Sequence, residues 1–210
     1  MLLAFDTSTP AVTVALHDGT RVRSEYTEVD ARRHGELLAP GIRRVLADAG
    51  VTVSELTAIA VGVGPGPFTG LRVGLVTARA MADALRIDVY GVCTLDVIAA
   101  DVALGEPFLV ATDARRREVY WATYDESGVR TRGPQVDRPV EIEWSGLAFG
   151  AGALMYSDAF TKAATPEFPS AGTLATMVAR RTATLLPPNP LYLRRPDAVE
   201  PAARKAVTPA

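Results

Sequence analysis

The sequence predicts an α/β protein built from two related lobes, of which the second is the smaller. An apolar strand that ends at an acid occurs twice, over residues 2–6 and 109–113, and the two copies lie 107 positions apart. Between them, short apolar runs alternate with longer amphipathic stretches in the order β-β-β-α-β-α-β. A mixed sheet that opens with a hairpin and carries helices is an α/β architecture. A chain of 210 residues that is 48% hydrophobic can form a core in each lobe.

The hairpin that opens each lobe carries the evidence for duplication. Without any gap, the same offset pairs Val12 with Val119 and Asp18 with Asp125. Each copy is then an apolar strand, a polar turn and a second strand that runs to an aspartate-containing turn. We therefore predict that the two lobes arose by duplication of one unit.

The first lobe, residues 1–104, continues beyond its hairpin with regular elements. Polar and apolar residues alternate over 21–29, which predicts a strand with one buried face. Apolar residues recur on one face of the following helix. The further elements predicted for this lobe are a helix over 36–49, a strand over 57–63, a helix over 70–86 and a strand over 88–93.

The second lobe, residues 105–210, is predicted to repeat the opening hairpin over 108–113 and 118–124 and then to differ from the first. Residues 127–145 are mostly polar and typical of turns. A strand is expected over 147–151 and a helix over 173–186, followed by a proline-rich tail. Whether this tail packs back on the first lobe stays open at this point.

A loop rich in glycine and proline, residues 64–70, connects the strand over 57–63 to the helix over 70–86. Thr69 is placed to cap that helix. Such a turn can direct backbone N–H groups and a helix N-terminus toward an anion. The spacing matches neither a Walker A loop nor a dinucleotide fingerprint, so a purely structural turn is the alternative interpretation.

Composition and charge narrow the class of protein. The formal net charge of −2 argues against a protein that holds nucleic acid by bulk electrostatics. Cys93 is the only cysteine, which excludes an internal disulfide and a multi-cysteine metal site. No apolar run approaches the roughly 20 residues of a membrane span, and residues 1–6 lack the basic start of a signal peptide, so we expect a cytoplasmic location. The arginine run at 115–117 has two interpretations, a solvated hairpin turn or a contact with an anionic partner.

Duplicated lobes with this order of elements resemble the actin, Hsp70 and sugar-kinase (ASKHA) superfamily, here with a reduced second lobe. In that superfamily the acids at the strand ends, which correspond to Asp6 and Asp113, face a nucleotide cleft. For Asp6, Thr7 and Ser8 the resemblance implies a loop that faces a phosphate or a metal. The alternative, which we favour, is an Asx or Ser/Thr turn that closes a hairpin. Members that hydrolyse ATP carry a full-sized second lobe.

Several segments together resemble the bacterial TsaB (YeaZ) family, a component of the machinery that makes threonylcarbamoyladenosine in tRNA. They span nearly the whole chain in order, and the glycine loop combined with the Asp-Ala-Arg-Arg hairpin is specific. One departure is Pro67, where family members usually carry serine, and it removes an N–H and a hydroxyl beside the helix start. The matching segments are residues 3–9, 34–38, 64–74, 113–122 and 190–194.

The resemblance implies a protein that is paralogous to the catalytic subunit of the same pathway but is not itself the catalyst. In the catalytic paralogue a His-x-x-x-His pair holds a metal just after the strand that corresponds to 89–93. Here Thr94 and Ile98 occupy the ligand positions, and neither is a useful ligand for iron or zinc. His17 and His34 are the only histidines, and we expect surface or packing roles for both. We therefore predict no catalytic residues and no metal site.

The helix predicted over 70–86 has a wider apolar surface than a helix that covers one sheet needs. Gly74, Ala78 and Ala82 lie four residues apart and form a ridge of small residues that would let another helix approach closely. The residues alone leave two interpretations, packing inside the chain's own fold or contact with a partner. The family resemblance implies pairing through the first-lobe helices. The predicted partner interface consists of Leu37, Leu38, Gly41, Leu71, Gly74, Ala78 and Met81.

The function implied by the resemblance is that of a non-catalytic scaffold and activator subunit. The complex would transfer threonylcarbamoyl to N6 of the adenosine beside the anticodon of tRNA. The implied partners are the catalytic paralogue TsaD, the P-loop ATPase TsaE, tRNA through the assembled complex, and a second copy of the chain when it is alone. ATP or ADP and metal are expected on the partner subunits and not on this chain.

Two other functions are considered beside this one. The first is a free-standing enzyme of the same fold, either metallopeptidase-like or a small kinase. Ser8 or Cys93 would be the candidate nucleophile, but neither has a sequence context that suggests activation. The second is a homodimeric binding module without an enzymatic partner. Co-purification of a histidine-rich paralogue from the native host would favour the complex.

Overall fold

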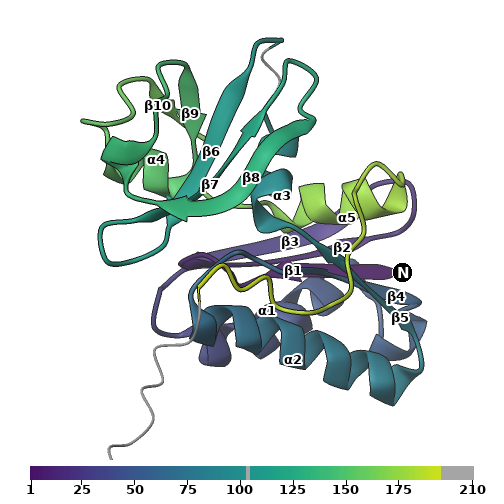
Figure 1. The fold of residues 1–210 in the computed structure, drawn as a ribbon. Coiled ribbons are helices and arrows are strands. Elements are labelled where there is room, and N and C mark those ends of the chain that lie inside the picture. The colour runs from purple at the N-terminus through teal and green to yellow at the C-terminus, as the bar shows by residue number, and fades with distance from the viewer. Residues whose placement is uncertain (103–104, 195–210) are drawn as a thin grey trace, which may run out of the picture.

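The computed structural model describes residues 1–102 and 105–194, and each lobe contains one five-stranded sheet (Figure 1). In the first sheet the strands lie in the order β3-β2-β1-β4-β5. Strand β1 pairs antiparallel with β2 and parallel with β4. The order of elements predicted for this lobe is confirmed. The strands are β1 Leu2–Asp6, β2 Ala11–His17, β3 Val22–Val29, β4 Ala58–Gly62 and β5 Asp88–Val92.

The second sheet repeats the topology of the first. Its order is β10-β9-β6-β7-β8, in which β6 pairs antiparallel with β7 and parallel with β9. In the first sheet β3, β2 and β1 pair antiparallel, and β4 and β5 continue parallel to β1. In the second sheet β8, β7 and β6 pair antiparallel in the same way, and β9 and β10 continue parallel to β6. This match confirms the predicted α/β class and the duplication. The strands are β6 Phe108–Asp113, β7 Val119–Tyr124, β8 Arg130–Asp137, β9 Leu147–Phe149 and β10 Ala163–Ala164.

The register of the two hairpins corrects one detail of the sequence comparison. Asp6 lies opposite Thr13 in the first hairpin, and Asp113 lies opposite Val119 in the second. The connection between the strands is thus one residue shorter in the second lobe. The structural counterpart of Val119 is therefore Thr13, and the gapless pairing of Val119 with Val12 is wrong.

Helices cover both faces of the first sheet (Figure 1). Helices α1 and α2 pack on one face, and α5 packs on the other against β1 and β2. In the described part of the chain, no helix is both long and apolar enough to cross a bilayer. The helices are α1 His34–Ala49, α2 Phe68–Leu85, α3 Thr94–Ala100, α4 Ala151–Met155 and α5 Ala171–Ala179, with short 3₁₀ turns at Val53–Glu55 and Pro139–Glu141.

The central strands explain why two helical layers are needed. Every residue of β1 and β2 is buried, and successive side chains of a strand point to opposite faces. Leu3 and Phe5 join the core beneath α1 and α2. Leu2 and Ala4 join the core beneath α5, together with Leu174. A sheet with a buried centre must be covered on both sides.

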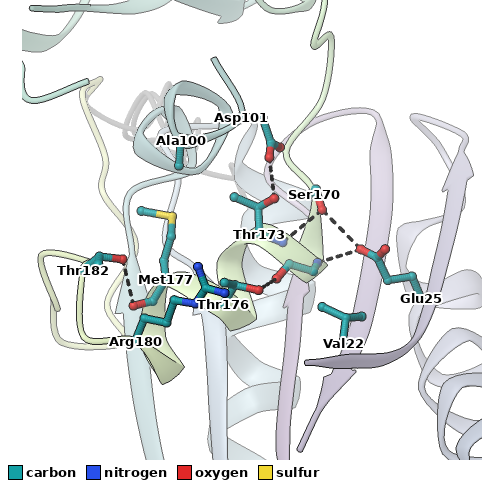
Figure 2. Close-up of a pocket in the computed structure, with 11 residues that line it drawn as sticks. Val22, Glu25, Ala100, Asp101, Ser170, Thr173, Thr176, Met177, Arg180 and Thr182 are labelled. Atoms are coloured by element: carbon teal, nitrogen blue, oxygen red, sulfur yellow. Dashed lines mark hydrogen bonds between the residues drawn. The ribbon is translucent and has the colours of Figure 1, made fainter. Parts of the chain in front are cut away.

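Helix α5 corrects the prediction for residues 173–186 in two ways. The helix ends at Ala179, because Arg181 adopts a left-handed backbone (φ 58°) and Thr182 N–H bonds back to Met177 O. It also belongs to the first lobe and not to the second. Figure 2 shows how it is attached there: Glu25 of β3 accepts hydrogen bonds from Gly172 N at 2.8 Å and from Ser170 Oγ at 3.2 Å.

Three further predictions were wrong. Strand β8 lies within residues 127–145, where no strand was expected, and its exposed outer side explains its polar sequence. Residue 151 begins α4 and does not extend the strand at 147–149. Helix α2 begins at Phe68 after Pro67, so Thr69 is not its cap. The short helices α3 and α4 were not predicted from the sequence.

The segment 186–191 lies against the first lobe. Leu186 and Gly91 exchange backbone hydrogen bonds of 2.8 and 2.9 Å, and Leu191 N donates to Val63 O at 2.9 Å. Arg194 then reaches the second lobe, where it donates to Ala114 O at 2.9 Å and pairs with Glu118. The chain therefore crosses from the first lobe to the second hairpin at this point.

Candidate functional site

The glycine loop packs directly on the turn between β1 and β2. A Cβ at Gly66 would clash with the carbonyl of Ser8, and a Cβ at Gly70 would lie 2.5 Å from Thr7 O. A Cβ at Gly74 would lie 2.5 Å from Thr7 Oγ1. Because a larger residue would push the two segments apart, glycine is required along this line of contact. This close packing supports the interpretation of the loop as a structural turn.

Thr7 links the start of α2 to this turn through two hydrogen bonds. Its hydroxyl donates to Gly70 O at 2.7 Å and accepts from Gly74 N at 3.0 Å. Gly70 O and Gly74 N are four residues apart, the spacing at which a helix pairs its own C=O and N–H groups, so the Thr7 hydroxyl bonds to both members of one such pair.

Asp6 is buried and is engaged on both oxygens by the chain itself. Ser8 N donates to Oδ1 at 2.6 Å, which makes an Asx turn, and Thr94 Oγ1 donates to Oδ2 at 2.7 Å. A Cβ at Gly62 would clash with the carboxyl group. Burial raises the pKa of Asp6 above its ordinary value, and the hydrogen bond from Thr94 is the largest opposing effect. The favoured interpretation of this segment, a turn that closes the hairpin, is confirmed.

A cavity of about 210 Å³ lies where the two lobes meet the glycine loop. Asp113 lines it, and Asp6 does not, so the structure does not bring the two strand-end acids together in one site. Arg115 shares the cavity and pairs with Asp113 at 3.5 Å, while its backbone N–H donates to the same carboxylate at 2.8 Å. The lining residues are Thr7, Thr9, Pro10, Ala31, His34, Pro67, Thr69, Gly70, Asp113 and Arg115.

Both histidine rings bond to backbone groups, His17 to a neighbouring residue and His34 to a residue in the turn between β1 and β2. His34 Nε2 lies 2.7 Å from Thr9 O, and His17 Nδ1 accepts from Gly19 N at 2.9 Å. These contacts explain packing roles for the two rings. Among the described residues, no group of three or more His, Cys, Asp or Glu side chains is placed to hold a metal ion.

The two candidate nucleophiles are buried. Cys93 has no exposed surface, and burial raises the pKa of its thiol to about 12. A thiol with this pKa stays protonated at neutral pH and is a poor nucleophile. Ser8 is 2% exposed and lies beneath Gly66. The structure therefore gives the free-standing enzyme hypothesis no activated nucleophile at these two positions.

The predicted interface residues lie mainly inside the chain's own fold, and their contact with a partner stays a prediction. Six of them are buried and Met81 is partly buried, packed against the same core. Their apolar character is explained by contact with the first sheet and between α1 and α2. The six buried residues are Leu37, Leu38, Gly41, Leu71, Gly74 and Ala78.

The outer face of α2 carries an exposed stripe of side chains that was not predicted from the sequence. Phe68 is 50% exposed and Val76 is 60% exposed, and Arg72 lies between them on the same stripe. The guanidinium of Arg72 lies 4.6 Å from the centre of the Phe68 ring, which stacks on Tyr192 at 5.7 Å. The spacing of four between these residues is the sequence signal that could have identified the stripe.

Comparison with known proteins places the chain in a family. A family model described as TsaD, tRNA N6-adenosine threonylcarbamoyltransferase, matches residues 22–198. An uncharacterized protein of Mycobacterium tuberculosis is 47% identical over 94% of this chain and 93% of its own length. The tRNA threonylcarbamoyladenosine biosynthesis protein TsaB of Escherichia coli is 36% identical over 61% of this chain and 57% of its own length. The structure of YeaZ from Pseudomonas aeruginosa superposes with a TM-score of 0.75 at 32% identity, covering 91% of this chain and 99% of that chain.

Two lobes of matching topology, each opened by a hairpin whose first strand ends at an acid, define a duplicated α/β protein, and YeaZ from Pseudomonas aeruginosa shares this fold. The chain belongs to the family that the matching model describes and, within it, to the TsaB (YeaZ) family.

Proposed function

We propose that this protein is a non-catalytic subunit of the bacterial machinery that makes threonylcarbamoyladenosine in tRNA. It binds and activates the catalytic paralogue TsaD. The names of its TsaB relatives support the pathway, and the burial of Asp6 with its hydrogen bond from Thr94 supports the absence of catalysis. ATP or ADP and the metal are carried by partner subunits, and TsaE and tRNA join through the assembled complex.

The observation that carries this proposal is the hydrogen bond between Thr94 and Asp6. An acid that assists metal or phosphate chemistry must present an accessible oxygen to the substrate cleft. Here each oxygen of Asp6 accepts one hydrogen bond from the chain itself, the carboxyl group is fully buried, and it does not line the cavity between the lobes. Thr94 and Ile98, at the ligand positions of the paralogue, are both fully buried.

The partner surface in this proposal is the outer face of α1 and α2. On α2 this face carries the exposed side chains of Phe68 and Val76 together with Ala80, and on α1 it carries Ala39 and Pro40. Small and apolar side chains on adjacent helices suit close packing with helices of a partner. In the absence of TsaD, the same face pairs with a second copy of the chain.

A single substitution tests the proposed surface. Val76→Glu places a charge in the centre of the exposed stripe, and we expect it to abolish co-purification with TsaD and tRNA modification by the complex. The matched control is Val129→Glu, because Val129 is 61% exposed but lies in the second lobe. Both variants should remain folded, since both side chains are on the surface. Full modification activity of Val76→Glu in a reconstituted assay would contradict the proposed surface.

A further inference from the structure

The second lobe carries a pocket that shares no residue with the inter-lobe cavity or with α1 and α2. Its volume is about 540 Å³, within the range of about 300–1,000 Å³ that small-molecule pockets occupy. Three segments line it: the β6–β7 turn, the segment just after β8, and the end of α4 with the residues that follow. The lining residues are Arg116, Arg117, Arg138, Pro139, Val140, Met155, Tyr156, Ser157, Asp158 and Ala159.

The β6–β7 turn presents its arginines from an unusual backbone. Arg115, Arg116 and Arg117 have φ values of 61°, 56° and 61°, so three consecutive residues with side chains are left-handed. Apart from glycine, asparagine and aspartate, residues rarely adopt this conformation, and then only singly. Strain of this kind is retained mainly where it serves a function. All three side chains are exposed.

The pocket is positively charged, and two of its arginine side chains can bind a ligand. Within the described residues, the side chains of Arg117 and Arg138 make no hydrogen bond or ion pair. Asp158 is the one carboxylate among the lining residues. Two guanidinium groups without a carboxylate partner are suited to a phosphate, which they can bind through paired N–H groups.

Apolar surface lies beside these charges. Val140 is 83% exposed and Met155 is 57% exposed, and Tyr156 and Pro139 line the same pocket. A ligand that carries only phosphate and hydroxyl groups would leave this surface uncovered. A nucleotide matches both parts, because its base is planar and stacks on aromatic and apolar side chains while its phosphate binds arginine.

We propose that this pocket binds a nucleotide, with the phosphate on Arg117 and Arg138 and the base against Val140, Met155 and Tyr156. The nucleotide can come from a single-stranded segment of RNA or from a free mononucleotide. The inference stands apart from the proposed function, because binding requires only the isolated chain and does not involve α1 or α2.

The test is fluorescence anisotropy of the isolated chain with a labelled single-stranded RNA of about eight nucleotides. We expect binding that weakens as salt rises from about 50 to about 200 mM. The double variant Arg117→Asn, Arg138→Gln should bind about tenfold more weakly and lower the salt slope by about 0.7, because both side chains contact one phosphate of a single strand. Asparagine is chosen at position 117 because it tolerates a left-handed backbone. Met155→Ser should weaken binding without changing the salt slope.

The control variant Arg32→Gln, Arg43→Gln removes the same charge from exposed arginines outside the pocket and should bind like the unmodified chain. A titration with AMP distinguishes the two sources of the nucleotide. AMP binding that depends on Arg117 and Arg138, without RNA binding, assigns the pocket to a free nucleotide. The proposal is overturned if neither RNA nor AMP binds, or if both double variants lose affinity equally. Circular dichroism of each variant verifies that the fold is retained.

Discussion

The hydroxyl of Thr94 donates to Asp6 and accepts from Gly64 N at 3.2 Å, so one side chain joins β1, the glycine loop and the first turn of α3. From the sequence, Thr94 was notable only as a residue that replaces a metal ligand. Its structural role depends on contacts with residues far away in the chain, and these could not be predicted from spacing. The local Asx turn at Asp6 could be predicted, because it involves only neighbouring residues.

Thr94→Val should destabilise the protein by about 2–3 kcal/mol, because a buried carboxyl and a buried N–H each lose a hydrogen-bond partner. Thr112→Val is the matched control. Thr112 is 3% exposed, and its hydroxyl has no partner among the described residues. Its replacement should therefore be neutral or slightly stabilising. Urea denaturation of both variants measures the two changes, and equal losses would argue against the role given to Thr94.

The raised pKa of Asp6 predicts a dependence of stability on pH. The native state binds this proton more tightly than the unfolded state, so the group's favourable contribution is complete below about pH 4 and is lost as pH rises through the native pKa. Asp6→Asn removes this titration. The free energy of unfolding of Asp6→Asn, measured relative to the unmodified chain, should rise between about pH 4 and about pH 7. A difference that stays constant over this range would contradict the assignment.

At the scale of elements, the periodic and buried segments were predicted, and the polar edge strand β8 and the end of α5 were not. Strands β1, β2 and β4 and helices α1 and α2 have strong apolar patterns because they form the first core. Strand β8 was missed because an edge strand needs only backbone pairing and tolerates Pro134. The end of α5 was misplaced because the stop is set by the backbone of Arg181, and neither glycine nor proline marks it.

The attachment of α5 gives a test at this scale. Glu25→Ala removes the acceptor for Gly172 N and Ser170 Oγ, and loss of such a helix cap costs about 1 kcal/mol. We expect faster amide hydrogen exchange in α5, with little change in α1. Glu28→Ala is the control, because Glu28 lies exposed on the same strand. Unchanged exchange in α5 would show that packing on β1 and β2 alone holds the helix.

At the scale of the whole molecule, the duplication and the two lobes could be read from the sequence, but the path of the chain could not. The strands of the first sheet all precede residue 93, and those of the second lie between 108 and 164. Helix α5 and the segment 186–191 then return to the first lobe. This return depends on which face of the first sheet lacks a cover, a property of the assembled fold and not of any local segment.

This path predicts that residues 1–104 do not form a stable unit. Without α5, Leu2, Ala4 and Ala60 would lose the cover that Leu174 and Ala175 provide. We expect the fragment to aggregate or to lack a cooperative thermal transition. Joining residues 165–194 to it through a flexible linker should restore one. A cooperative transition in the fragment alone would contradict the prediction, and calorimetry of the two proteins provides the measurement.

The position of α5 near the end of the chain also affects how the protein folds during its synthesis on the ribosome. A ribosome releases the chain from its N-terminus, so the whole second hairpin emerges before the residues that close the first sheet. Until then one apolar side of β1 is open to other nascent chains. Codon changes that slow translation between β5 and α5 should therefore lower the soluble yield of the protein, while its final stability stays the same.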